Sequence, residues 1–399
     1  MLNSYNKGKV FFGFFTFVVV ITCLFPYVTL YSFGTDLQPW SICLIMIYSL
    51  VILFYHFYFP KVLLFLIIPF FTALFLLLVS NNFYDSIRSL LGYASVLFIP
   101  FAFYSILLRN KGVLFFSLKV STIIYFIVAL IQFFYDKYFF SFLLNRISTT
   151  DSRGVTSLTP EPTFYGLVCL FLILIFLSLE IKNRNIYALL LVFQILFLAQ
   201  SSMVTLFLFI FLGYYFLSKM KVKNFFFLLL FSFVLFFSFF YLKEFNLDSR
   251  GVRIFEILSM VLKSPMNILM LDASINDRAS AIYFSLKGFL DNYFLPNGFG
   301  EYANYVGWEL PQQNVFPPDS TRIRIMSYYG GVFFELGFYG LFIPLSYMLC
   351  MVKAYKYSWR KFFLYFGFIN TILFSAIPLT FTFVGIYIAC LLYKGERSL

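Results

Sequence analysis

The sequence predicts an all-α polytopic integral membrane protein. Of its 399 residues, 62% are hydrophobic and only 12% are charged, whereas about a quarter of the residues of soluble proteins are charged. Phe alone accounts for 62 residues and Tyr for 30, a composition typical of lipid-facing helices and of aromatic belts at membrane interfaces. We therefore expect a single membrane domain over residues 1–399.

Apolar runs divide the chain into about twelve candidate spans, because a spanning helix needs roughly 20 predominantly apolar residues. The expected spans in the first half are 10–31, 39–59, 62–80, 89–108, 114–135 and 164–181. Those in the second half are 186–199, 203–218, 224–242, 327–351, 362–377 and 379–393. Residues 186–218 are apolar except at Gln200-Ser201-Ser202, and one helix of this length would measure about 50 Å. We expect the chain to fold back at these three residues.

The distribution of Lys and Arg predicts the orientation, since cytoplasmic loops of membrane proteins are enriched in both. With the amino terminus inside, the short loops on its side hold many Lys and Arg but only two acids, Glu180 and Glu396. The formal net charge of +12 then reflects topology, and we expect no nucleic-acid partner. Both termini are predicted to be cytoplasmic.

Two polar segments interrupt the spans, and both are predicted to lie on the periplasmic face. The smaller covers residues 136–163 and the larger covers 243–326. All five cysteines fall in predicted spans, and the single histidine, His56, lies at the inner end of the second span. We therefore expect no disulfide, no metal site and no cofactor.

The smaller segment places a carboxylate at the start of the sixth span. Pro160 and Pro162 bracket Glu161 and restrict its backbone to extended or helix-start geometry. One interpretation is an ordinary capping Glu at a helix amino end. The other is a general base or acceptor-orienting group with Arg153 as its anion-binding companion. The pattern alone leaves both open.

The larger segment is predicted to be partly helical. Residues 253–262 have the spacing of an amphipathic helix at the membrane interface. A second helix is expected to start after Asn276 or Asp277, with Arg278 in its first turn, and to end near Tyr293. An arginine at a helix start strengthens an anion site. Arg278 could contact lipid phosphates rather than form a ligand site. For Arg250 and Arg253, contact with lipid phosphates is the favoured interpretation.

Short motifs in the smaller segment resemble those of a known family. Arg153-Gly154, followed by Pro160-Glu161-Pro162-Thr163, resembles the Arg-Gly and Glu-Pro-Ser/Thr pattern that precedes a central span in O-antigen polymerases. The order of the motifs relative to the spans adds to this resemblance, which covers nearly the whole chain.

The carboxy-terminal half is similar to the wider superfamily of O-antigen polymerases and ligases. The similar features are Asp277-Arg278, the Asn-Gly-Phe-Gly turn at 297–300 and Glu335 to Gly340. Ligases of this superfamily carry a histidine in the large exterior loop and an arginine at the turn after the seventh span. Here the larger segment has no histidine, and that turn is Gln200-Ser201-Ser202. We therefore expect a polymerase rather than a ligase.

The resemblance implies a metal-independent, inverting glycosyltransferase. Its substrate would be an undecaprenyl-pyrophosphate-linked oligosaccharide, joined to an incoming repeat unit outside the membrane. Glu161 would deprotonate or orient the acceptor hydroxyl, and Arg153 and Arg278 would neutralise pyrophosphate. Residues expected to bind substrate or a lipid phosphate are Arg146, Tyr165, Arg322 and Arg324.

Other proteins of the same pathway are implied as partners, together with membrane lipid. They are a chain-length regulator of the polysaccharide co-polymerase type and the flippase for the lipid-linked units. A flippase is also the strongest alternative function for this chain, although the sequence shows no internal repeat and no charge pair at the membrane midplane, both typical of transporters. Glu335 lies inside a span, and we expect it to be a hydrogen-bonded structural position.

Overall fold

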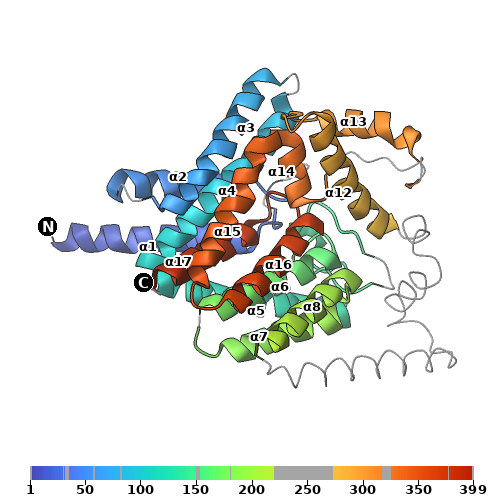
Figure 1. The fold of residues 1–399 in the computed structure, drawn as a ribbon. Coiled ribbons are helices and arrows are strands. Elements are labelled where there is room, and N and C mark those ends of the chain that lie inside the picture. The colour runs from blue at the N-terminus through green and yellow to red at the C-terminus, as the bar shows by residue number, and fades with distance from the viewer. Residues whose placement is uncertain are drawn as a thin grey trace, which may run out of the picture.

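The protein is described by a computed structural model that covers eleven stretches of the chain. These are residues 2–29, 31, 36–56, 59–80, 83–149, 153–179, 181–219, 273–313, 315–316, 325–375 and 377–397. Within them the fold is entirely helical and contains no β-strand (Figure 1). The predicted span 224–242, the amphipathic helix 253–262, Arg250 and Arg253 lie outside the described residues.

Every predicted span within the described residues coincides with a helix. The first half contains α1 (Leu2–Leu24), α2 (Trp40–His56), η1 (Lys61–Leu66) continuing into α3 (Ile67–Val79), α4 (Phe83–Arg109), α5 (Lys111–Phe134) and α6 (Pro162–Leu179). Next come α7 (Arg184–Phe193), which continues into the π-helical turn η3 (Gln194–Ala199), and α8 (Ser202–Lys219). The remaining helices are α12 (Ala273–Asp291), α13 (Glu301–Glu309) with η4 (Leu310–Gln312), α14 (Tyr328–Leu336), η5 (Gly337–Leu341), α15 (Phe342–Ala354), α16 (Trp359–Ser375) and α17 (Thr382–Arg397).

Five of the described helical segments are long and apolar enough to cross a membrane. They are Lys61–Val79, Ser86–Arg109, Lys111–Phe134, Pro162–Leu179 and Tyr328–Ala354. Four shorter apolar helices accompany them: Phe12–Leu24, Trp40–Tyr55, Arg184–Ala199 and Ser202–Tyr215. The chain is therefore a helical protein with the character of a membrane protein.

Two local features decide where the early and middle helices end. The helix α1 stops at Leu24 instead of continuing to residue 31, because Pro26 follows and disfavours helical geometry at Phe25. The fold-back expected at Gln200 is confirmed as a helix break. Gln200 has a positive φ of 45° and ends η3, and α8 begins two residues later.

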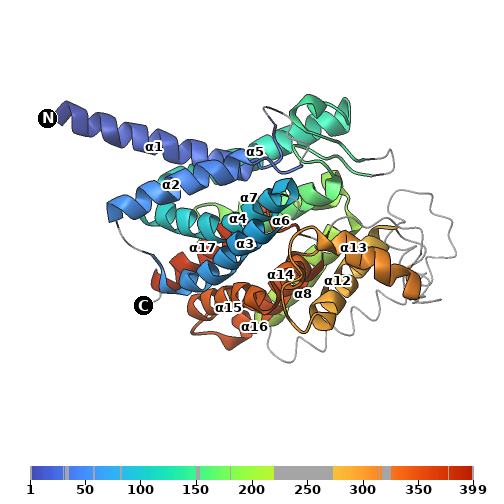
Figure 2. The same cartoon turned by 90° about the horizontal axis from the view of Figure 1, so that it is seen from above.

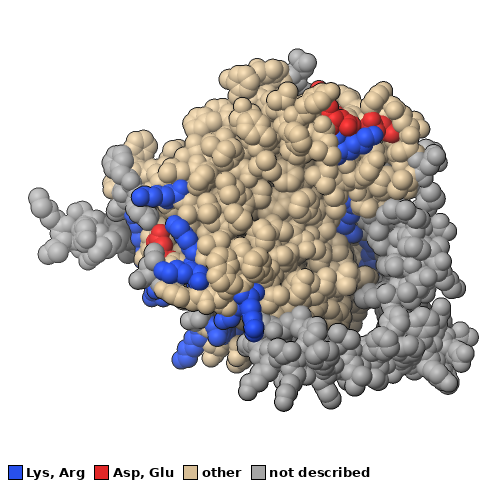
Figure 3. Space-filling model, in the orientation of Figure 1, with Lys and Arg blue, Asp and Glu red and all other residues tan. Residues whose placement is uncertain are grey.

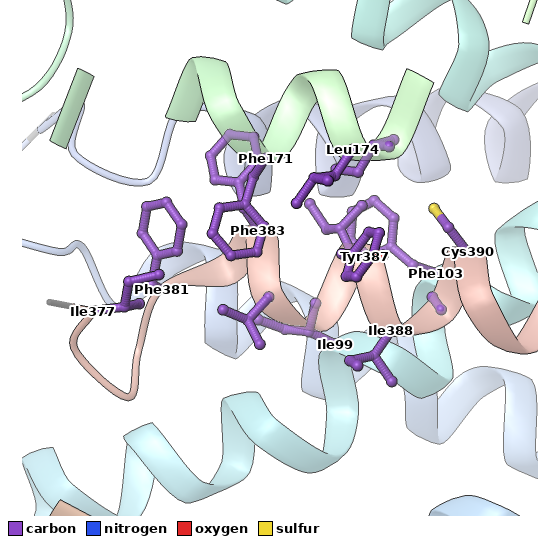
Figure 4. Packing of buried hydrophobic residues seen from close by; sticks show 14 of the residues in the cluster. Ile99, Phe103, Phe171, Leu174, Ile377, Phe381, Phe383, Tyr387, Ile388 and Cys390 are labelled. Atoms are coloured by element: carbon purple, nitrogen blue, oxygen red, sulfur yellow. The ribbon is translucent and has the colours of Figure 1, made fainter. Parts of the chain in front are cut away.

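The helix α17 lies at the centre of the core, to which most of the helices contribute. It packs against α4, α15 and α6, and Tyr387 of α17 and Phe381 just before it meet Phe171 of α6 (Figure 4). Of the 18 residues of α6, 83% are buried, so this helix is surrounded by protein. The start of α6 is therefore held rigidly.

The two ends of the bundle differ in charge. Both chain termini lie at one end in both ribbon views, and α12 and α13 lie at the other (Figures 1 and 2). Lys and Arg side chains gather at the end with the termini (Figure 3), where Lys394 lies over Tyr355 and Arg397 over Tyr393.

We expect Gly385→Leu to destabilise the bundle, because a Cβ at this position of α17 would lie 2.7 Å from Ile99 Cγ2 and 3.1 Å from Pro100 Cδ. Overpacking of this kind costs about 1–3 kcal/mol. Gly367→Leu in α16 is the matched control, since its Cβ meets nothing within 4 Å. Thermal unfolding in detergent, followed by a thiol-reactive dye that reports the four buried cysteines, measures the difference. Equal melting temperatures of the two variants would contradict the close packing of α17 on α4.

Candidate active site at the start of α6

An irregular segment of the smaller polar loop runs inside the helical bundle. Residues 154–160 contain no helix, yet each of them is buried, with Thr156, Ser157 and Thr159 fully inaccessible. Non-helical backbone at this depth needs a partner for each buried polar group, because an unpaired one is costly. The loop expected to lie on the surface therefore re-enters the protein just before α6.

Gln132 in the last turn of α5 holds the middle of this segment. Its amide nitrogen donates to the carbonyl oxygens of Ser157 (3.1 Å) and Phe139 (2.9 Å), and its amide oxygen accepts from the Ser157 backbone N–H (2.6 Å). The Ser157 hydroxyl donates to the Tyr125 carbonyl at 2.8 Å. One buried Gln side chain thus joins the two arms of the loop to α5.

Gly154 is required by the close approach of the loop to the end of η3. A Cβ here would lie 2.2 Å from the Ala199 carbonyl oxygen and 2.3 Å from that of Leu198. The next residue, Val155, donates its backbone N–H to the Leu198 carbonyl at 2.9 Å, and so satisfies a carbonyl that the helix end leaves unpaired. The Gly of the Arg-Gly motif therefore has a packing role.

Glu161 directly precedes α6, as the flanking prolines predicted. Its backbone carbonyl accepts from the Tyr165 N–H (3.1 Å) and from the Thr159 hydroxyl (2.9 Å), which fixes the main chain. Its side chain is 20% exposed and points away from this network to the outer loops. The positive end of the α6 dipole favours a carboxylate here.

Arg146 links the Glu161 carboxylate to a second acid, Asp36. The Arg146 guanidinium forms two 2.8 Å bonds to the two Asp36 oxygens, and its Nη2 also lies 3.2 Å from Glu161 Oε1. The hydrogen bond to Asp36 raises the pKa of Arg146, which therefore stays charged. Among the described residues, Oε2 of Glu161 accepts no hydrogen bond. This carboxylate is held by one oxygen and has the other available.

Tyr27 adds a buried hydroxyl next to this ion cluster. Its ring centroid lies 5.6 Å from that of Phe164 in the first turn of α6, and the residue is only 1% exposed. The hydroxyl has no hydrogen-bond partner among the described residues. Burial raises the pKa of Tyr27 well above its usual value, and Tyr125, Asp36 and Glu161 shift it in the same direction. Tyr27 is thus a neutral O–H donor beside two carboxylates.

Two cations of the same loop lie near the cluster in sequence. The Lys137 ammonium donates to the Arg153 carbonyl, and the Thr149 hydroxyl donates to the Gly154 carbonyl at 3.0 Å. The Arg153 guanidinium is half-buried and forms no ion pair or side-chain hydrogen bond with any described residue. Arg153 is therefore the free cation of this loop within the described part of the chain.

Tyr165 was expected to bind substrate, but the structure places it inside the bundle. It is 0% exposed, and its hydroxyl donates to Gln194 Oε1 at 2.7 Å. Gln194, the first residue of the π-helical turn η3, is buried and faces α6. Tyr165 thus braces α6 against η3 and is left out of the site proposed below.

Arg278 belongs to a different element from Glu161. The helix α12 begins at Ala273, so Asn276 closes its first turn, and Asp277 and Arg278 lie in the second turn. The dipole effect falls off within the first turn, and the anion-site argument from helix position therefore fails for Arg278. The two other predicted substrate contacts, Arg322 and Arg324, lie outside the described residues.

Glu335 makes the hydrogen bonds expected of a structural acid within a span. Its carboxylate accepts from the Tyr93 hydroxyl at 2.7 Å and from the Ser89 hydroxyl at 3.3 Å. These bonds connect α14 to α4. The turn at 297–300 lies beside them, because the Gly298 N–H donates to the Glu335 carbonyl at 3.2 Å.

Asp36 and Tyr27 were not predicted as site residues. Asp36 is the single carboxylate between the first two predicted spans, but a lone acid in a short loop gives no sign that it will meet Arg146. Tyr27 follows Pro26 beyond the end of α1 and packs on Phe164. Both residues belong to the segment between α1 and α2, which the sequence pattern did not connect with residues 136–163.

The arrangement suits proton abstraction and anion neutralisation. Glu161 offers a carboxylate oxygen, Tyr27 a neutral donor, and Arg153 a guanidinium without an ion pair to any described residue. Within the described residues, no group of three or more His, Cys, Asp or Glu side chains could hold a metal ion. A scan against protein-family models finds no match to the chain, and a search of curated proteins finds none either.

We expect Gly154→Ala to displace the loop, because the added methyl cannot coexist with the carbonyl oxygens of Leu198 and Ala199. The expected cost is about 1–3 kcal/mol. Gly112→Ala at the start of α5 has open space around its Cβ and serves as the control. The melting temperature in detergent checks this, together with limited proteolysis of the loop. A Gly154→Ala protein as stable and as protease-resistant as the control would show that the loop does not pack on η3.

Proposed function

We propose that this chain is a glycosyltransferase that polymerises lipid-linked oligosaccharide repeat units at the outer face of a bacterial cytoplasmic membrane. The product would be O-antigen or a related surface polysaccharide. The observation that carries the proposal is the Glu161 carboxylate at the start of α6, held through one oxygen by Arg146. Glu161 shares its loop with Arg153, which has no ion pair with a described residue, and Tyr27, whose hydroxyl is buried, packs on Phe164 in the first turn of α6.

The proposed reaction is a single displacement at the anomeric carbon of the donor glycan. Glu161 Oε2 takes the proton of the acceptor hydroxyl, and the acceptor oxygen forms the new bond to the anomeric carbon. The bond from that carbon to the pyrophosphate oxygen breaks, and the electron pair leaves with polyprenyl pyrophosphate. Attack from the face opposite the leaving group inverts the anomeric centre. General-base catalysis of this kind contributes about 10²- to 10⁴-fold.

Arg146 acts as a positioning residue in this scheme. Asp36 occupies its guanidinium fork with two hydrogen bonds, so Arg146 has little capacity left for a phosphate. Its remaining contact orients Glu161. The substrate-binding role expected from the sequence is accordingly replaced by one of orienting the base.

Arg153 is the proposed ligand of the donor pyrophosphate. Guanidinium groups bind phosphate oxygens through a rigid fork and remain charged, and Arg153 has no competing ion pair with a described residue. Pyrophosphate is a good leaving group, so neutralising its developing charge supplies much of the acceleration. Arg278 would join from α12, and Tyr27 would donate to the acceptor oxygen or to Glu161.

The test of Glu161 uses a strain without this gene, complemented with wild type or variants at matched membrane levels. We expect Glu161→Gln to collapse the surface-glycan ladder to a single repeat unit, because the amide cannot accept the proton. Asp136→Asn, an equal charge change in the same loop at an exposed acid that caps its own turn, should keep the full ladder. A full ladder from Glu161→Gln would remove the proposed base.

The deletion strain also separates polymerase from flippase and ligase. Single lipid-linked units accumulate outside the membrane when a polymerase is missing, and inside when a flippase is missing. Complete loss of surface glycan, with accumulated lipid-linked material, would contradict the polymerase assignment and favour one of the other two functions.

We expect Arg153→Ala to slow polymerisation by about 10²- to 10³-fold, the usual effect of removing one preorganised charge-stabilising donor. Arg153→Lys should recover part of the rate, since the charge remains while the fork is lost. Arg360→Ala, at an exposed residue at the start of α16, is the control. The rate of ladder appearance after induction measures the three variants. If Arg153→Ala polymerised at the same rate as the control variant, the donor pyrophosphate would not bind at Arg153.

A further inference from the structure

A polar depression lies on the far end of the molecule, outside the site described above. It has a volume of about 550 Å³ and lies between α13 and the turn that follows α12. The side chains that line it and matter here are Asn292, Asn297, Glu301, Asn304, Tyr305 and Trp308. Pockets of roughly 300–1,000 Å³ hold ligands of drug size, so the depression can take a short oligosaccharide.

One face of α13 forms the wall of this depression. Glu301, Asn304, Tyr305 and Trp308 are spaced at three, four and seven residues, and such positions lie on one side of a helix. The opposite face, which includes Tyr302 and Val306, is buried and packs with Phe284 and Phe334 of α12 and α14. The polar face therefore has a fixed orientation.

Hydrogen bonds hold the lining groups in place. The Tyr305 hydroxyl donates to Asp291 Oδ2 at 2.6 Å, and the Asn304 amide donates to Glu301 Oε2 at 3.0 Å. The Asn297 amide nitrogen donates to the carbonyls of Gly288 and Phe334, both at 3.1 Å. Glu309, at the end of α13, is 4% exposed and pairs with Lys287 of α12. The wall is thus anchored to α12 before any ligand binds.

Acidic side chains dominate the charge of this region. Figure 3 shows Asp and Glu grouped where α13 lies in Figure 1, with a basic side chain beside them. Of the two cations on α12, Lys287 is neutralised by Glu309, and Arg278 lies near the opposite end of the helix from Asp291. Asp291 and Glu301 are exposed and form hydrogen bonds with neutral groups. A phosphate or pyrophosphate would be repelled here. The ligand must therefore be neutral or basic at this point.

Trp308 supplies an apolar surface within this polar wall. It is 63% exposed, so most of its indole faces solvent. The face of an aromatic ring carries partial negative charge and attracts the weakly positive C–H groups on one side of a sugar ring. Carboxylates and amide oxygens beside it accept hydrogen bonds from sugar hydroxyls, and those to a carboxylate are the stronger. An exposed Trp flanked by Glu301 and Asn304 is the combination that a pyranose requires.

We propose that the α12–α13 depression binds uncharged sugars of the lipid-linked glycan, with a sugar ring on Trp308 and its hydroxyls on Glu301 and Asn304. This inference rests on the proposed function for the identity of the glycan, but not for the binding itself. A separate site for sugars on the outer face would hold the chain near the membrane between successive transfers. Its loss should shorten the polymer without ending polymerisation.

The test uses the full-length protein in detergent and, as probe, one to three repeat units released by mild acid from the host's own surface glycan. Saturation-transfer NMR detects binding and a titration gives the affinity. We expect Trp308→Ala to weaken binding about tenfold or more, the loss of one ring contact, and Glu301→Gln to weaken it as well. Trp359→Ala, at an equally exposed Trp (63%) at the start of α16, should bind as wild type does. Inorganic pyrophosphate should not compete.

Several outcomes would overturn the site. They are unchanged binding by both Trp308→Ala and Glu301→Gln, competition by pyrophosphate, or no binding of the oligosaccharide to wild type at all. Failure of the proposed function gives a different result: Glu161→Gln would then keep the full ladder while Trp308→Ala still loses oligosaccharide binding. In the complemented strain, Trp308→Ala should give a ladder shifted to shorter chains, whereas Glu161→Gln should give one repeat unit.

Discussion

The backbone of residues 154–160 passes through the apolar interior of a helical bundle without forming a helix. The position of the proposed site depends on the hydrogen bonds that satisfy the polar groups of this segment. An unsatisfied buried backbone group costs about 1–3 kcal/mol. Gln132, the carbonyls of Leu198 and Tyr125, and the tight approach at Gly154 provide the partners and the space. These contacts bring the chain to the start of α6 in one defined conformation.

The ion cluster of Asp36, Arg146 and Glu161 has a different importance. Its members are 21%, 47% and 20% exposed, and exposed pairs contribute only about 0–1 kcal/mol to stability. Comparison of the two magnitudes shows that the buried hydrogen bonds hold the loop, while the ion cluster mainly orients the Glu161 side chain. The Glu161 carboxylate is oriented by one weak contact and has few others. It is therefore freer to react than a carboxylate held in a buried salt bridge.

The same separation of scaffold and site recurs at the α12–α13 depression. There the packing around Phe334, together with the buried Glu309 that pairs with the partly exposed Lys287, fixes α13, and the exposed face is left to Trp308 and its polar neighbours. The two proposed sites differ in chemistry. In one, a carboxylate and a guanidinium without an ion pair to any described residue would serve a reacting hydroxyl and a phosphate, and the other would bind neutral sugars. A polymer that grows from a charged lipid carrier presents both kinds of group.

The helices themselves could be predicted from the sequence, because long apolar runs and the interruption at Gln200 are local signals. The start of α6 could be predicted for the same reason, from Pro160 and Pro162 around Glu161. The burial of 154–160 could not, since its Thr and Ser residues are polar and their partners lie on α5 and η3. Nor could the hydrogen bond from the Tyr165 hydroxyl to Gln194, which lies on another helix, or the meeting of Asp36 with Arg146. The start of α12 was misplaced because Asn276 resembles a cap but lies within the helix.

The most direct test of the central claim is to reconstitute the purified protein in liposomes with a lipid-linked repeat unit and to measure released polyprenyl pyrophosphate and glycan length together. The account predicts one polyprenyl pyrophosphate released for each new glycosidic bond, with glycans of two or more units formed by wild type and none formed by Glu161→Gln. Movement of the lipid-linked unit across the bilayer without any new glycosidic bond, or equal polymer formation by Glu161→Gln, would contradict it.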